Sequence, residues 1–159
     1  MPQPIIAAVN GPATGGGLGF ALGADVRIAA RSAVFAVSFI RVGLSGCDIG
    51  VSYLLPRLVG ASRAFELLLT GRTFDAAEAE RMGLVLEVVD DDALMASALA
   101  TARLIRANSA FGVWMTKEVM WANLETPGLA AAIDRENRTQ ILAQHSGDMA
   151  DAVRAFLKK

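Results

Sequence analysis

Short apolar runs rich in β-branched residues alternate with glycine-rich turns over the first 40 or so positions. Residues 4–9 (PIIAAV) and 24–29 (ADVRIA) each have the length and composition of a buried strand, and residues 33–37 (AVFAV) add a third run. The stretch 16–23 between the first two runs has a helical pattern. A strand, a helix and a second strand in this order predict a crossover that places the two strands parallel in a largely buried sheet.

From about Asp48 onward the apolar positions follow the spacing of helices, and capping residues and glycines mark the helix ends. Ser62 is in position to cap a helix that Gly71 ends. Asp75 is followed three residues later by Glu78, which is the pattern of a capping box at the start of another helix. These signals predict two helices in the middle of the chain.

Beyond these two helices the pattern predicts one more strand and then only helices. Residues 84–89 (LVLEVV) have the composition of a strand. The three aspartates that follow place negative charge at the start of a long helix through Arg106, where it complements the helix dipole. Further helices are predicted over residues 109–125, 128–143 and 146–157.

Composition limits the class of protein. A chain of 159 residues, 53% of them hydrophobic, fits one ordinary domain with a packed core. Its single cysteine, Cys47, excludes an intramolecular disulfide framework, and the first residues lack the pattern of a signal peptide, so we expect a cytoplasmic protein. No apolar stretch approaches the roughly 18 residues of a membrane span. The 15 basic and 16 acidic side chains are interspersed, which argues against nucleic acid as a partner.

Residues 10–23 (NGPATGGGLGFALG) place glycines at positions 15, 16, 17, 19 and 23, around the expected start of a helix. A glycine inside a helix costs up to about 1 kcal/mol relative to alanine, so bare backbone must serve a purpose here. The first amides of a helix have no acceptor inside it, and glycines let a carbonyl oxygen or an anion approach them. A dinucleotide fingerprint would need glycine at Phe20 or Leu22, and no Gly-Lys-Ser/Thr phosphate loop follows. Two uses remain: an oxyanion hole, or close packing of helix against strand.

Several segments, in the same order along the chain, resemble the crotonase superfamily of enoyl-CoA hydratases and isomerases. They are AAVNGPATGGGLGFALGADVRIAA, AVFAVSFIRVGL, LLPRLVG, LLLTGRTFDAAEAERMGLVLEVV and AFL near the end. The resemblance covers the C-terminal half or somewhat more of a usual family chain. It implies an α/β fold, the crotonase-like (ClpP/crotonase) spiral of β-β-α units, truncated at the N-terminus and followed by a C-terminal helical region. Residues 1–90 are then expected to form the spiral core and residues 91–159 a helical trimerisation region.

The resemblance also implies an acyl-CoA thioester as substrate, with two backbone amides that stabilise the enolate formed from it. Gly16, the middle glycine of the triplet, matches one donor, and the second is expected from the N-terminal units that this chain lacks. Gly15, Gly17 and Phe39 are the other positions expected to bind substrate. No metal and no separate cofactor are implied, because coenzyme A enters as part of the substrate. The expected assembly is a homotrimer or hexamer.

The family's hydratases use two glutamates as acid and base, and the matching positions here are Gly19 and Phe39, which cannot move a proton. In some family isomerases an aspartate lies in the loop before LLPRLVG, and Asp48 lies in that loop after an alignment shift of one residue. The alternative for Asp48 is a cap on the helix beginning near Ile49. The resemblance therefore favours double-bond isomerisation or atypical hydration over two-glutamate hydration. A catalytically silent acyl-CoA-binding or assembly subunit is the alternative function.

Overall fold

The computed structural model describes residues 1–149, 153–154 and 157, so the helix predicted over 146–157 lies partly outside the described residues. The chain divides into two compact units. One comprises residues 5–102, and the other comprises residues 1–4 together with 103–159. The first unit contains every strand of the described chain, and with them the glycine turn.

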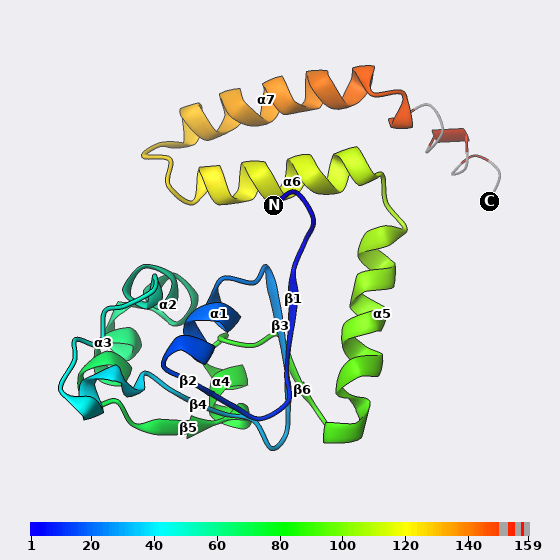
Figure 1. The fold of residues 1–159 in the computed structure, drawn as a ribbon. Coiled ribbons are helices and arrows are strands. Elements are labelled where there is room, and N and C mark those ends of the chain that lie inside the picture. The colour runs from blue at the N-terminus through cyan, green and yellow to red at the C-terminus, as the bar shows by residue number, and fades with distance from the viewer. Residues whose placement is uncertain (150–152, 155–156, 158–159) are drawn as a thin grey trace. The chain divides into compact units, whose positions relative to one another are not determined.

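A three-stranded parallel sheet lies at the centre of the first unit (Figure 1). Its strands, in spatial order, are β1 (Ile6–Val9), β3 (Val26–Ala30) and β6 (Glu87–Val89). Both pairings are parallel, which confirms the predicted crossover from the first strand to the second. The four residues of β1 are half-buried, whereas β3, paired on both sides, is buried along almost its whole length.

A second small sheet is built from the segments that follow the strands of the first. It contains β2 (Pro12–Thr14), β4 (Val34–Ala36) and β5 (Thr73–Asp75), with β2 parallel to β4 and β5 antiparallel to it. Because β1 leads into β2 and β3 leads into β4, equivalent strands of successive repeats pair with each other. This arrangement is the predicted winding of strand-strand-helix units, although the sequence pattern did not single out β2 and β5.

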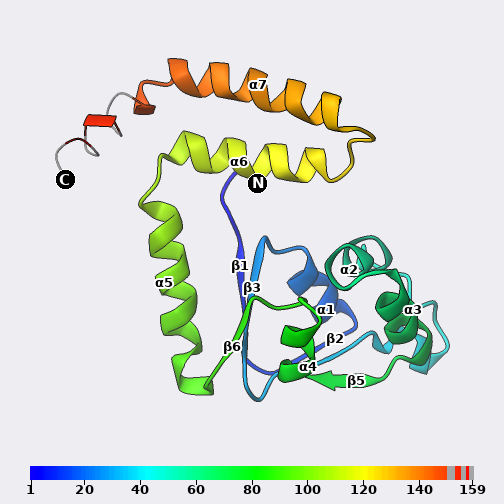
Figure 2. The same cartoon turned by 180° about the vertical axis from the view of Figure 1, so that it is seen from behind.

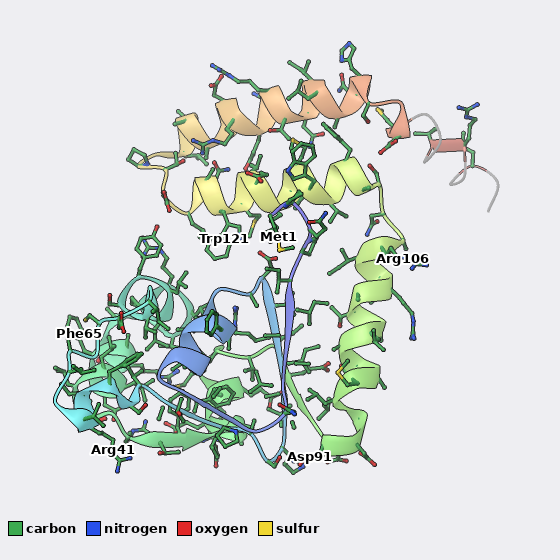
Figure 3. The ribbon with its side chains drawn as sticks, viewed as in Figure 1. Met1, Arg41, Phe65, Asp91, Arg106 and Trp121 are labelled. Carbon is green, nitrogen blue, oxygen red and sulfur yellow. The ribbon has the colours of Figure 1, made fainter. Side chains whose placement is uncertain are left out.

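Helices pack around the two sheets of the first unit (Figures 1 and 2), and the last of them continues four residues (103–106) beyond the boundary of this unit. They are α1 (Gly16–Leu22), the 3-10 helix η1 (Ser38–Val42), α2 (Val51–Val59), α3 (Ala61–Thr70), α4 (Ala76–Arg81), the 3-10 helix η2 (Asp91–Ala93) and α5 (Leu94–Arg106). The main core contains most of the largest fully buried side chains, including Phe35, Leu18 and Leu55. A smaller core joins Leu94 and Ala98 of α5 to β3. Asp91 and Arg106 lie near the two ends of the η2–α5 segment (Figure 3).

The ends of the middle helices follow the predicted signals with one exception. Gly71 ends α3 in the left-handed conformation, with φ 60°, as predicted. The Asp75 side chain accepts the Glu78 amide at 2.7 Å, which confirms Asp75 as the cap, whereas the Glu78 carboxylate accepts from Arg72 at 3.0 Å in place of completing the predicted capping box. Ser62 was the wrong cap, because α3 begins at Ala61 after Gly60 and Ser62 lies inside its first turn. The helix begins two residues earlier than a Ser62 cap would place it, because Gly60 makes the turn that separates it from α2.

The second unit contains a pair of helices, α6 (Ala110–Asn123) and α7 (Leu129–His145), close to two of the helices predicted from the sequence. The Arg135 guanidinium on α7 donates to Asn123 at 2.5 Å and to Thr126 at 2.6 Å, which ties α7 to the end of α6. No residue of either helix is fully buried in the described chain.

Candidate active site

The glycine turn joins β2 to α1 and fixes where the helix begins. Gly15 has φ 51°, and its amide donates to the Ala36 carbonyl of β4 at 3.0 Å. The first helical hydrogen bond runs from the Gly19 amide to the Gly15 carbonyl at 3.1 Å. The amides of Gly16 and Gly17 precede the first donor of the helix and have no acceptor within it. The turn therefore presents bare amide donors at a position that a sheet hydrogen bond holds in place.

Phe39 packs on this turn. A Cβ added at Gly15 would lie 3.1 Å from Ser38 Oγ and 3.5 Å from the Phe39 ring atom Cε1. The positive φ and these close neighbours both restrict position 15 to glycine. Phe39 is half-buried and comes from η1, directly after β4. The structure therefore brings the glycine triplet and Phe39 together, although they are more than 20 positions apart in the sequence.

Ile49 is a component of the site that sequence analysis missed. Its φ of 39° makes it the only non-glycine residue with positive φ in the described part of the chain. Holding a β-branched residue in this conformation costs about 1–2 kcal/mol, so tertiary packing must hold it there. The Cδ1 atom of Ile49 lies 3.8 Å from the point where a Cβ on Gly16 would stand, and 2.3 Å from the equivalent point on Gly19. The Ile49 side chain thus lies against the first turn of α1.

Asp48, the proposed acid–base residue, is exposed and does not cap α2. Its Oδ1 atom accepts the Ile49 amide at 2.8 Å, and its backbone carbonyl accepts the Val51 amide at 2.9 Å. The N-cap of α2 is Gly50, in the left-handed conformation at φ 83°, and no side chain caps this helix. The capping alternative for Asp48 is therefore wrong. The reason is that two successive left-handed residues turn the chain before α2 begins.

Arg27 is a second residue that the sequence pattern did not single out, and it fixes the other end of α1. Its side chain is buried, with Nε donating to the Leu84 carbonyl at 2.8 Å and Nη1 donating to the Ala24 carbonyl at 2.6 Å. Nη1 also lies 3.3 Å and 3.4 Å from the carbonyls of Leu22 and Ala21. Burial lowers the pKa of Arg27 from its ordinary value. A charged residue inside the apolar run 24–29 was the available signal.

The described residues offer no other obvious chemical centre. Among residues 1–149, 153–154 and 157, no group of three or more histidine, cysteine, aspartate or glutamate side chains is placed to hold a metal ion. Within the same ranges, no helix combines the length and the apolar character needed to cross a membrane. The glycine turn, with Phe39 and Ile49 packed against it and Asp48 adjacent to Ile49 in the chain, is therefore the candidate site.

Comparisons with known proteins identify the family and the fold. The enoyl-CoA hydratase/isomerase family model matches residues 1–159. The chain is 46% identical over 144 residues to the probable enoyl-CoA hydratase EchA12 of Mycobacterium tuberculosis, a match covering 91% of this chain and 50% of that protein. The structure resembles an enoyl-CoA hydratase from Bacillus anthracis with a TM-score of 0.95 and 35% identity, covering 99% of this chain and 60% of that one.

A second solved structure is a monofunctional enoyl CoA isomerase from M. smegmatis. It matches with a TM-score of 0.77 and 49% identity, covering 83% of this chain and 62% of that one. These likenesses confirm the predicted crotonase fold. The chain spans about half the length of the curated relatives it matches.

Proposed function

The chain belongs to the enoyl-CoA hydratase/isomerase family, and from this premise we propose that it acts on acyl-CoA thioesters by stabilising an enolate. The observation that carries the proposal is the turn at Gly15. The Gly15 amide donates to the Ala36 carbonyl, and the next amide, that of Gly16, lies at the start of α1 and has no acceptor within the helix. A thioester carbonyl oxygen is a suitable acceptor for that amide, and its charge grows as the enolate forms. The resemblance implies a second amide donor, which we do not assign to any of these 159 residues.

The proposed reaction is the migration of a double bond along the acyl chain. The Asp48 carboxylate removes a proton from the carbon next to the double bond, and the electron pair moves onto the thioester oxygen. The Gly16 amide stabilises that oxygen, and the Asp48 carboxyl then returns the proton to a different carbon of the same substrate. One group that exchanges one proton is sufficient, so no water is consumed and no second carboxylate is needed.

The side chains around the turn support isomerisation over two-carboxylate hydration. Gly19 and Phe39 stand at the positions where the resemblance places glutamates, and neither has an ionisable group. Phe39 and Ile49 instead surround the turn with apolar groups. Adding water across the double bond needs both a base for water and an acid for carbon, and Asp48 alone would have to serve as both.

Replacing Asp48 with asparagine tests the proposed role. The asparagine side chain would keep an oxygen able to accept the Ile49 amide, so the loop should fold as before while the proton carrier is lost. We expect Asp48→Asn to lower the isomerisation rate about a hundredfold or more at an unchanged melting temperature. Asp92→Asn, which changes an exposed aspartate before α5, is the matched control and should leave the rate unchanged. The measurement is turnover of 2-enoyl-CoA and 3-enoyl-CoA esters by protein of native length.

An unchanged rate in Asp48→Asn would remove Asp48 from the mechanism. The second candidate function, a catalytically silent acyl-CoA-binding or assembly subunit, is favoured by the lack of ionisable groups at Gly19 and Phe39. Both functions require binding of acyl-CoA in preference to free acids or nicotinamide cofactors, because the CoA portion supplies remote binding energy. Calorimetry tests binding, and turnover across a panel of CoA esters separates the two. NAD bound as tightly as acyl-CoA would contradict both.

The proposed assembly is a homotrimer or a pair of trimers. Exposed apolar side chains on the helix pair support it: Met120 is 60% exposed, Leu129 76% and Leu142 58%. Phe65 on α3, 64% exposed, adds an apolar group on the first unit (Figure 3). Isolated exposed apolar residues are ordinary, but several on one helix pair favour a contact surface. Light scattering on protein of native length should give three or six times the monomer mass, and a monodisperse active monomer would contradict the assignment.

A further inference from the structure

The position and backbone conformation of Ile49 indicate a role in the candidate site. Its side chain is 50% exposed, yet its backbone is held in the left-handed conformation directly after Asp48. The hydrogen bond from its amide to Asp48 Oδ1 couples it to the proposed proton carrier. Ile49 is therefore a strained apolar residue that lies between the Asp48 carboxylate and the start of α1. A role in the site explains why this residue is held there.

The Ile49 side chain occupies the space that any side chain at position 19 would need. Gly19 is buried, and a Cβ built on it would lie 2.3 Å from Ile49 Cδ1 and 2.6 Å from Ile49 Cγ1. Distances this short cannot coexist, so a larger residue at position 19 would displace the isoleucine. By contrast, a Cβ at Gly17 would meet nothing within 4 Å. The bare backbone at Gly19 therefore accommodates Ile49, whereas that at Gly17 faces open space.

We propose that Ile49 determines which reaction the site performs. The inference rests on the proposed function and deepens it: Ile49 fills the volume beside Gly16 and Gly19 with hydrocarbon, which excludes water and any carboxylate from that side of the thioester. Hydration breaks an O–H bond of water, forms a C–O bond at the β carbon, and sends the released proton to a carboxylate while the α carbon gains one. With Ile49 in place neither the water nor its base has room, and proton return through Asp48 is the remaining path.

The contact itself is tested by a double-mutant cycle on melting temperature. In the Ile49→Ala background, Gly19→Ala should raise the melting temperature by about 2–4 °C, because alanine is the better helix former and the collision has been removed. In the wild-type background the same Gly19→Ala change should lower it, because the new Cβ displaces the isoleucine. An equal rise in both backgrounds would show that Ile49 does not occupy this volume and would overturn the inference.

The reaction is tested by the ratio of 3-hydroxyacyl-CoA to isomerised enoyl-CoA, measured by mass spectrometry on protein of native length. Ile49→Ala should raise this ratio at least about tenfold, and Gly19→Glu/Ile49→Ala should raise it further, because the glutamate supplies a base for water. Gly19→Glu in the presence of Ile49 should gain less than the double variant. Leu86→Ala removes an exposed apolar side chain before β6 and is the matched control, with an unchanged ratio.

The outcomes separate the two claims. If the wild-type protein isomerises its substrate and the ratio is the same in Ile49→Ala and in the double variant, the role of Ile49 is overturned and the proposed function stands. If the wild-type protein turns over no CoA ester, the proposed function fails and the inference fails with it. A rise in the ratio in both variants, together with the sign change in the melting cycle, supports the inference.

Discussion

Replacing Arg27 with methionine tests whether a buried guanidinium fixes the end of α1 opposite the glycine turn. Methionine keeps a long unbranched stem that fits the same space but removes every donor. The carbonyls of Leu84 and Ala24 then lose partners that now donate at 2.8 Å and 2.6 Å. The two contacts longer than 3.2 Å, to the carbonyls of Ala21 and Leu22, contribute little at that length.

The magnitude follows from two hydrogen bonds by a charged donor, each contributing about 1.5–3 kcal/mol. Burial disfavours the charged form of Arg27 and lowers its pKa. Because methionine removes this desolvation cost, the net loss of stability is smaller than the sum of the two hydrogen bonds. We therefore expect Arg27→Met to lower the free energy of unfolding by about 3 kcal/mol. For a chain of this length that corresponds to a melting temperature about 6–12 °C lower.

Thermal and urea denaturation followed by circular dichroism provide the measurement. Arg31→Met is the matched control, because Arg31 follows the same strand but is 72% exposed and pairs with Asp90 at the surface. An exposed pair contributes less than about 1 kcal/mol, so the control should lose little stability. If Arg27→Met costs no more than Arg31→Met, the guanidinium does not hold α1 and the reasoning from its hydrogen bonds is refuted.

Two further predictions concern the same unit. Hydrogen bonds from Arg72 hold the pKa of Glu66 and Glu78 below the ordinary 4.5, so the stability they supply is present above that value and is lost as pH falls through the lower folded pKa. The melting temperature of Glu78→Gln should therefore fall less than that of wild type between about pH 5 and pH 3, and parallel curves would contradict the assignment. Gly71→Ala should cost about 2–4 kcal/mol, because φ is 60° and the added Cβ would meet Ile40 Cγ2 at 2.5 Å. Gly11→Ala, with nothing within 4 Å, is its control in the same melting assay, and an equal loss in both would refute the steric argument.

The sequence was informative where local chemistry determines the structure. Strands β1 and β3 and the turn at Gly15 follow from β-branched runs and from glycines at positions that need them. The cap at Asp75 follows from the preference of a short carboxylate for a free helix amide. Strands β2 and β5 have only three residues each and exist through pairing with β4, which no local pattern reports.

The site was less predictable because its missed components depend on contacts between distant segments. Local preference assigns the left-handed conformation to Gly50 but not to the β-branched Ile49 before it, and packing against α1 overrides that preference. Arg27 lies in an apolar strand, where sequence alone does not show that the carbonyls of Leu84 and Ala24 converge on it. In both cases the partner lies on a different element of the fold.

The seven residues of α1 are too few to form a stable helix alone, so its position is a property of the surrounding fold. Three contacts define it: the Gly15 amide on Ala36, the Arg27 guanidinium at the far end, and the Ile49 side chain against the first turn. The first two belong to the strands and fix where the Gly16 amide points. The third belongs to an exposed loop outside the sheets. Because the first two contacts fix the Gly16 amide, a change in that loop alters mainly what lies beside the amide donor and leaves the direction of the donor to the strands.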